Sequence, residues 1–295
     1  MMIIAALGLA LLIYPQAGDW FSTISHNTQL SGYSQDVNNL EPSVRSRLLN
    51  DAREYNSKIP VGQLLDPYSQ AAASAPSGAQ HDQYEQQLNV NNDGVIGQLS
   101  YPALNIDLAI YHGTGDDVLG KGVGHLFGSS LPVGGPGTHS VLTSHSGIPN
   151  AELFTPLHQA KEGQVFYIKV LDRTFVYQVE KIEVVQPDDI SSLKVVPGKD
   201  QVTLITCTPI GVNSNRLLLH ASRIADLPQD DPQQQTLAGR QSTLAFPYWA
   251  LLYVAGLLAF YIGARYWNRR GSRAQARQLK GSQEPTSPEP PLESQ

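Results

Sequence analysis

The stretch from Val95 to Ile224 consists of short β-like runs separated by glycine and proline, and no part of it shows a long helical period. The runs are Leu108 to Tyr111, His139 to Thr143, Val165 to Val170, Thr174 to Val185, Val202 to Cys207 and Leu217 to Leu219. Closing a sheet on itself removes its exposed edges. These roughly 130 residues therefore predict a mainly β fold, a closed or nearly closed barrel of about eight strands.

Composition limits the classes of function that the chain can have. It has 295 residues with 41% hydrophobic and 16% charged side chains, which suits one or two globular domains rather than a disordered chain. The formal net charge is −6, and basic residues are dense only near the C-terminus. Nucleic acid is therefore not an expected partner.

An uncharged run of 19 residues, Phe246 to Ala264, is close to the length that crosses a bilayer. Aromatic residues lie at both of its ends, where they favour the membrane interface: Phe246, Tyr248, Trp249, Tyr261, Tyr266 and Trp267. The tail 265–295 is basic, with Arg265, Arg269, Arg270, Arg273, Arg277 and Lys280. This pattern predicts a transmembrane helix with a cytoplasmic C-terminus, whereas a buried core helix would not need the basic flank.

The remaining parts of the chain are assigned by composition. We expect residues 1–20, with the apolar run Met1 to Tyr14, to be a signal peptide or a signal-anchor helix. Residues 21–94 form a region with a helix at Pro42 to Tyr55 and a connector at Ser69 to Gln80. The barrel domain covers 95–225, a polar linker 226–245, and the transmembrane helix 246–264.

Cys207 is the only cysteine, so it is either a buried filler or a reactive thiol. Side chains alternate along a strand, so Thr203, Ile205 and Cys207 share one face. The loop after Cys207 contains Pro209 and Gly211, and a hairpin there would bring Arg216 beside the thiol. A guanidinium in that place can lower the thiol pKa or stabilise a developing oxyanion, or it can simply pair with a carboxylate at the barrel rim.

A cysteine nucleophile needs a partner for proton transfer, and eight histidines are candidates. His145 ends a strand-like run and is followed by Ser146 and Gly147, a rim position from which a side chain can reach a cleft. Among the other histidines, we expect His26, His81 and His158 in solvent, and we expect His112, His125 and His220 to be structural.

Several ordered blocks of the chain resemble the class C sortases, the pilin-polymerising cysteine transpeptidases of Gram-positive bacteria. The blocks are Ala109–Thr114, Gly122–Leu126, Gly128–Gly135, Val141–Gly147, Thr203–Pro209 and Asn215–Leu218. The resemblance runs from about Asp51 to Ile224 and implies a sortase β-barrel with a catalytic triad of Cys207, His145 and Arg216. Ser146 and His220 depart from residues that are frequent at these places in the family.

The tetrapeptide Leu65-Asp66-Pro67-Tyr68 resembles the lid signature of the same family, although an Asp-Pro pair alone more often begins an ordinary turn. The lid would cover the empty active site. We expect Asp66 to pair with Arg216, Pro67 to shape the segment, and the Tyr68 ring to pack over Cys207, so that opening is a gating step.

The resemblance implies a reaction without a metal or an organic cofactor. Cys207 would attack the Thr carbonyl of a Leu-Pro-x-Thr-Gly sorting signal at the C-terminus of a secreted pilin, and a lysine of the next pilin would resolve the thioester into an isopeptide bond. The catalytic domain would then be extracellular and anchored to the cell membrane. Asn89 to Gly94 resembles half of a calcium loop, but its twelfth position is Ser100, so no calcium is expected.

Two rival functions remain open at this point. A wall-anchoring sortase would join surface proteins to a peptidoglycan amine; the lid tripeptide and the C-terminal membrane helix favour the pilin enzyme. A catalytically silent, membrane-tethered binding module would use Cys207 only as packed interior.

Overall fold

The computed structural model describes residues 2–59, 64–69, 78–227 and 246–281. Two compact units make up the chain. One comprises Gly18–Ala245 and contains the predicted barrel, and the other combines Met1–Ala17 with Phe246–Gln295.

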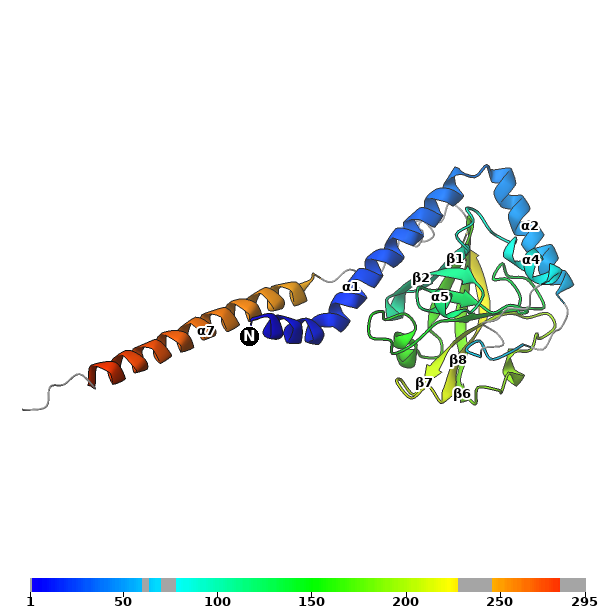
Figure 1. The fold of residues 1–295 in the computed structure, drawn as a ribbon. Helices are drawn as coiled ribbons and strands as arrows, with labels where there is room; N and C mark the ends of the chain where they lie inside the picture. The colour runs from blue at the N-terminus through cyan, green and yellow to red at the C-terminus, as the bar shows by residue number, and fades with distance from the viewer. Residues whose placement is uncertain (1, 60–63, 70–77, 228–245, 282–295) are drawn as a thin grey trace, which may run out of the picture. The chain divides into compact units, whose positions relative to one another are not determined.

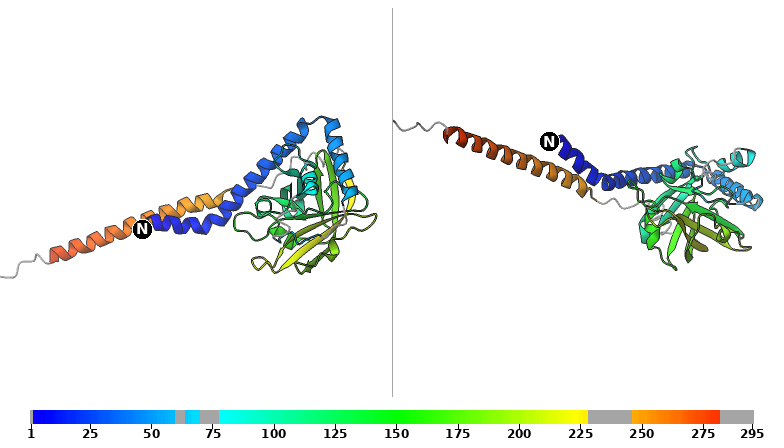
Figure 2. Two further views of the ribbon diagram at one scale, coloured as in Figure 1. Left: turned by 45° about the vertical axis from the view of Figure 1, so that its right-hand side comes forward. Right: turned by 60° about the horizontal axis from the view of Figure 1, so that its bottom comes forward.

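Eight strands close into a barrel in the order β1-β2-β3-β4-β7-β8-β6-β5 (Figures 1 and 2). Their bounds are β1 Val95–Tyr101, β2 Ile106–His112, β3 Val123–His125, β4 Thr138–Thr143, β5 Val165–Val170, β6 Arg173–Val185, β7 Asp200–Thr208 and β8 Asn215–Leu227. The pairs β2–β3 and β4–β7 are parallel and the others are antiparallel. The predicted mainly β fold and the eight-stranded barrel are confirmed.

The predicted strand-like runs do not include β1 or β3, and each omission has a physical reason. Strand β1 is buried at every residue and therefore shows no alternation, and β3 has only three residues, one of them Gly124. Strand β8 continues to Leu227, so Asp226 belongs to the barrel rather than to the predicted linker. Residues 228–245, which contain the rest of that linker, lie outside the described part.

Side-chain alternation on β7 separates two hydrophobic clusters. Val202 and Leu204 point into the barrel core. Ile205, on the opposite face, belongs to a smaller cluster outside the barrel that also includes Val141 and Leu218. Because Cys207 shares the face of Ile205, the thiol lies on the outer side of the barrel wall.

Helices and short 3-10 turns precede or connect the strands, namely α1 Met2–Asn39, α2 Pro42–Lys58, α4 Ala79–Glu85, α5 Asp116–Leu119, η1 Pro102–Leu104, η2 Thr155–Gln159 and η3 Ser191–Leu193. Helix α2 confirms the predicted helix and begins at Pro42, a residue that suits a first turn. Its Asn56 side chain donates to the Leu131 carbonyl and accepts from the Leu131 amide. The end of the predicted connector, Ala79 and Gln80, already belongs to α4.

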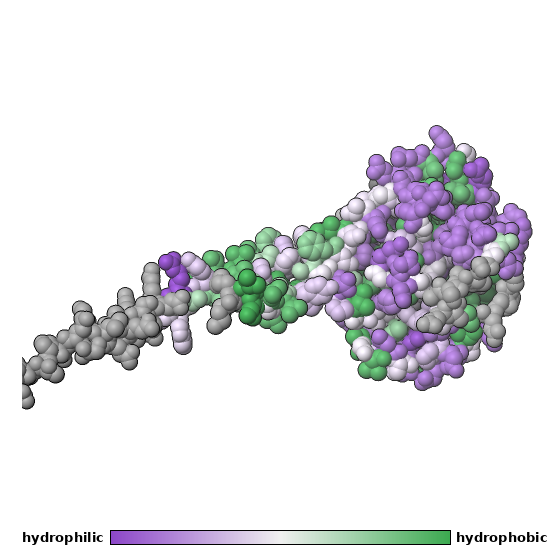
Figure 3. Space-filling view, in the orientation of Figure 1, coloured by the Kyte–Doolittle hydropathy of each residue, from purple (hydrophilic) through white to green (hydrophobic). Residues whose placement is uncertain are grey.

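Two helices of the described part are long and apolar enough to cross a membrane, over Ile3–Asn39 and Tyr248–Trp267. The second lies in α7 (Tyr248–Gly281), which contains most of the predicted transmembrane segment. Figure 3 shows hydrophobic residues gathered along these helices and a largely hydrophilic surface on the barrel. Helix α1 runs without interruption through the predicted boundary at residue 20 and contains Pro15, which lacks a backbone donor.

Candidate active site

Three neighbouring strands bring the predicted catalytic residues to one rim of the barrel. In the antiparallel pairing of β7 and β8, Cys207 lies opposite Arg216. In the parallel pairing of β4 and β7, Thr143 lies opposite Ile205, so His145, two residues further on, follows β4 at the level of Cys207. The strand register therefore brings these three residues to one rim of the barrel.

A direct hydrogen bond ties the loop of His145 to the strand of Cys207. The Ser146 hydroxyl, which is buried, donates to the Cys207 carbonyl at 2.8 Å. On the other side, the Phe154 amide donates to the His145 carbonyl at 3.0 Å. The imidazole of His145 is therefore carried by a backbone segment that is hydrogen-bonded to the strand of Cys207.

Arg216 makes a bidentate ion pair with Asp66. Its Nε and Nη2 atoms donate to the two carboxylate oxygens of Asp66 at 2.9 and 2.8 Å. Its Nη1 atom donates to the carbonyls of Asn213 and Asn215, both at 3.1 Å. Both charged side chains are largely buried, so the pair is shielded from solvent screening and its geometry is defined.

The segment 64–69, which we call the lid segment, covers the site through Tyr68. The Tyr68 ring centre lies 5.9 Å from that of His145 and 4.9 Å from the Arg216 guanidinium carbon. Its hydroxyl donates to the Ser144 carbonyl at 2.7 Å and accepts from the Thr143 hydroxyl at 2.7 Å. Tyr68 thus reaches past the catalytic side chains and is anchored on strand β4.

The predicted ion pair between Asp66 and Arg216 is present. The Tyr68 ring lies against two residues, His145 and Arg216. Tyr68 also lowers the pKa of the Cys207 thiol, although burial, the largest effect, raises it. Its ring packs between His145 and Arg216 rather than only over the sulfur. Pro67 is buried and adds no donor of its own.

Burial determines the resting protonation of the site. It raises the pKa of the Cys207 thiol, and Arg216 opposes that effect only partly. Burial also lowers the pKa of His145, against the opposite effect of Asp116. Under the closed lid segment, a neutral thiol beside a neutral imidazole is therefore the favoured resting pair at neutral pH.

Sequence reasoning missed the contacts of two residues that shape the site, Thr143 and Ser146. The sequence marks Ser146 only as a departure from the family pattern and Thr143 only as a strand residue. The Thr143 hydroxyl bonds to Tyr68 of the lid segment, and the Ser146 hydroxyl bonds to Cys207 of β7. A single sequence does not show that these distant residues are neighbours. The place of Ser146 directly after His145 was the one available signal.

Other histidines are part of the packing. The prediction that His26 lies in solvent is wrong, because it is 8% exposed and contacts the Ser22 hydroxyl at 3.2 Å. His112 and His125 are buried around Tyr84. Within the described ranges, no group of three or more His, Cys, Asp or Glu side chains has the arrangement of a metal site.

Comparison with known proteins places this geometry in context. A sortase domain model matches residues 99–224. The structure of sortase C-1 from Actinomyces oris is similar at 44% identity over 62% of this chain and 99% of that one, with a TM-score of 0.60. The pilus-related sortase C of group B Streptococcus is similar at 40% identity over 65% and 95%, with a TM-score of 0.58.

A curated relative carries a different subclass name. Sortase A of Streptococcus agalactiae is 30% identical over 138 residues, which are 46% of this chain. The chain spans 55% of the length of that relative.

Proposed function

Because this chain belongs to the sortase family of cysteine transpeptidases, we propose that it cuts an LPxTG-type sorting signal between Thr and Gly and joins pilin subunits through lysine isopeptide bonds. One observation carries the proposal. Cys207, His145 and Arg216 come from neighbouring strands to one rim of the barrel, under a segment that pairs with Arg216 and packs on His145.

Each catalytic residue has a separate role in the proposed reaction. Cys207 first gives its proton to His145 and then, as the thiolate, attacks the Thr carbonyl carbon, and Arg216 stabilises the oxyanion that forms. The C–N bond breaks as His145 gives a proton to the leaving Gly amine, which leaves a thioester on Cys207. A neutral lysine amine of the acceptor pilin then attacks the thioester, its proton passes to the now neutral His145, and the C–S bond breaks as the Cys207 thiolate departs.

The geometry adds a condition to this mechanism. Asp66 occupies the guanidinium fork of Arg216 with both carboxylate oxygens. While this pair persists, that edge of Arg216 is not available to an oxyanion. The lid segment must therefore move before the first step, which makes opening part of the proposed cycle.

The pilin assignment is supported by two features. The lid tripeptide occupies the site as the class C resemblance implies, and one solved relative is a pilus-related sortase C. The alternative is a wall-anchoring sortase, whose acceptor is a peptidoglycan amine instead of a pilin lysine. The same acyl-enzyme serves both functions, so the acceptor distinguishes them.

An acceptor competition tests the proposal. We expect the full-length chain in detergent to transfer a labelled sorting-signal peptide to a lysine-containing pilin peptide at least about tenfold faster than to a cross-bridge peptide at equal concentration. Mass spectrometry of the products measures the two rates, and the pilin peptide with its lysine acetylated is the matched control. Faster transfer to the cross-bridge peptide would support the wall-anchoring alternative instead.

We also propose that the chain is anchored in the cell membrane with the barrel outside and the C-terminus in the cytoplasm. The α7 helix is apolar over Tyr248–Trp267, and the arginine-rich sequence follows it. Protease added to intact protoplasts should therefore digest the barrel and leave an epitope tag at the C-terminus intact. Digestion of the tag with survival of the barrel would reverse the orientation.

A further inference from the structure

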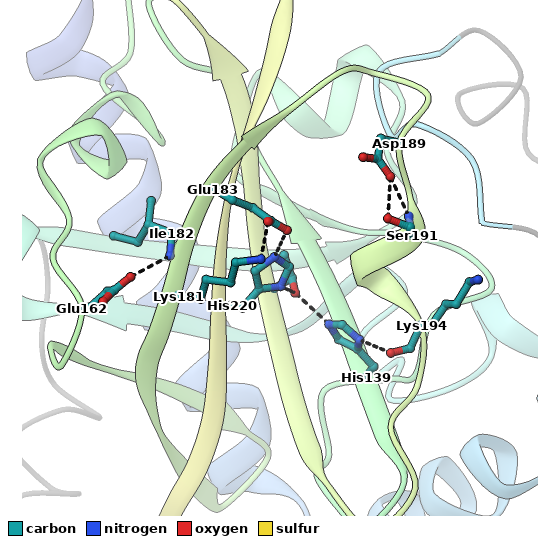
Figure 4. Close-up of polar contacts among 10 residues, drawn as sticks. His139, Glu162, Lys181, Ile182, Glu183, Asp189, Ser191, Lys194 and His220 are labelled. Carbon is teal, nitrogen blue, oxygen red and sulfur yellow. Dashed lines mark hydrogen bonds and ion pairs between the residues drawn. The ribbon is translucent and has the colours of Figure 1, made fainter.

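A second group of polar side chains crosses four adjacent strands on the outer face of the barrel, away from Cys207 (Figure 4). His139 of β4 contacts the Thr203 hydroxyl of β7 through Nε2 at 2.7 Å. The same hydroxyl contacts Nδ1 of His220 on β8 at 2.9 Å, and Nε2 of His220 contacts Glu183 of β6 at 2.9 Å. At the other end, Nδ1 of His139 contacts the Lys194 carbonyl at 3.1 Å.

The hydrogen-bonding capacities of these groups fix the direction of three of the four contacts. A carbonyl oxygen only accepts, so Nδ1 of His139 must carry a proton toward Lys194. Burial lowers the pKa of His139, so at neutral pH the ring is neutral and its Nε2 has no proton. The Thr203 hydroxyl therefore donates to Nε2 of His139. The Glu183 carboxylate only accepts, so Nε2 of His220 donates to it, and Nδ1 of His220 can donate to Thr203 only when His220 is an imidazolium.

Thr203 is thus the central member of the chain, because its single hydroxyl contacts both His139 and His220. The Thr203 side chain is fully buried, and His139 and His220 are buried as well. The far end is charged, since Glu183 pairs with Lys181 as well as with His220. The hydrogen bond from Lys181, together with that from His220, holds the pKa of Glu183 to about 2, so this end stays a carboxylate.

Lys194 belongs to the loop that connects β6 and β7, residues 186–199. The loop contains the η3 turn and closes over the polar chain. Its own internal bonds are local, such as the Ser191 hydroxyl donating to Asp189 at 2.6 Å. The carbonyl of Lys194 therefore links the loop to the barrel wall through His139 and Thr203.

The same loop packs against the lid segment. Leu193 is buried in the outer cluster with Ile205, and Ile190 packs on its edge. Leu64 and Tyr68 of the lid segment pack on the same cluster. The loop is thus one wall of the surface on which the closed lid segment rests.

We propose that Thr203 is a positioning residue for the lid segment, because its hydroxyl completes the hydrogen-bonded chain that holds the β6–β7 loop as the wall against which Leu64 and Tyr68 pack. The inference rests on the proposed role of this segment as a lid. It assigns Thr203, His139 and His220 a function that is separate from the chemistry at Cys207.

Two substitutions at one position test the proposal in the full-length chain in detergent. Thr203→Val keeps the shape and removes the hydroxyl, whereas Thr203→Ser keeps the hydroxyl. We expect Thr203→Val to raise amide hydrogen exchange in residues 64–69 and 186–199, and the alkylation rate of Cys207, by about tenfold. Thr203→Ser should restore the wild-type values.

A matched control separates this effect from general loosening of the barrel. Thr174 of β6 is also buried, and its hydroxyl has no hydrogen-bond partner among the described residues. Thr174→Val should leave exchange in the lid segment and alkylation of Cys207 unchanged. Equal values in Thr203→Val, Thr203→Ser and wild type would overturn the proposal.

The wild-type chain gives an independent signature if Thr203→Val does not fold. Nitrogen NMR of the imidazoles at neutral pH should show His139 with its proton on Nδ1, and a proton on Nε2 instead would overturn the proposal. Neither measurement requires turnover. Normal exchange behaviour with no transpeptidation would therefore contradict the proposed function while leaving this inference intact.

Discussion

Replacing Cys207 with alanine is expected to abolish transpeptidation, with product formation below about a thousandth of the wild-type rate. The proposed reaction has no route around the thioester, and the chain has no second thiol. In cells, the high-mass ladders of linked pilins should disappear. Gel electrophoresis of cell-wall extracts and the peptide assay in detergent measure the two effects.

The fold should survive this substitution. Cys207 is at the end of a strand on the outer face, and the inner face of β7 supplies the barrel core. Val212→Ala, in the loop after β7, is a suitable control because its side chain is 69% exposed. Persisting ladders in Cys207→Ala would refute the assignment of Cys207 as the nucleophile. Loss of ladders in Val212→Ala would show that the assay reports damage to the loop instead of loss of the thiol.

Removing the plug is expected to have the second largest effect, in the opposite direction. The double variant Asp66→Ala and Tyr68→Ala loses the ion pair to Arg216 and the ring contact with His145. A lid that is closed 90 to 99% of the time reduces the competent fraction by about tenfold to a hundredfold. Cleavage of a short sorting-signal peptide should rise by about that factor.

The double variant has a matched control in the same segment. Leu65 directly precedes Asp66, and its side chain is 44% exposed, so Leu65→Ala should leave cleavage near the wild-type rate. The comparison is made from initial rates at low peptide concentration, where access to the site limits turnover. An unchanged rate in the double variant would contradict the claim that the lid segment blocks the active site.

Much of this site could be predicted because strand alternation is a local property. The pattern around Cys207 placed Ile205 and Thr203 on the thiol's face, and the hairpin placed Arg216 opposite the thiol, as the register has it. The parallel pairing of β4 with β7 is not local. The position of His145 beside this pair was implied by the family resemblance, and the register agrees with it.

The contacts that could not be predicted join segments distant in sequence. Nothing in the strand patterns pairs His139 with Thr203, or the lid segment with Leu193. A buried histidine in a single sequence has the same pattern as an exposed one, as the wrong prediction for His26 shows. Tertiary packing determines which group each buried polar side chain bonds to.

The most direct test of the central claim is the mass of the enzyme during turnover. The full-length chain is mixed with a sorting-signal peptide without an acceptor amine, quenched in acid and measured by intact-mass spectrometry. We expect an increase equal to the peptide fragment ending at Thr less one water, removable by hydroxylamine and mapped to Cys207. An adduct on another residue, or cleavage that proceeds equally well in Cys207→Ala, would contradict thioester catalysis at this barrel rim.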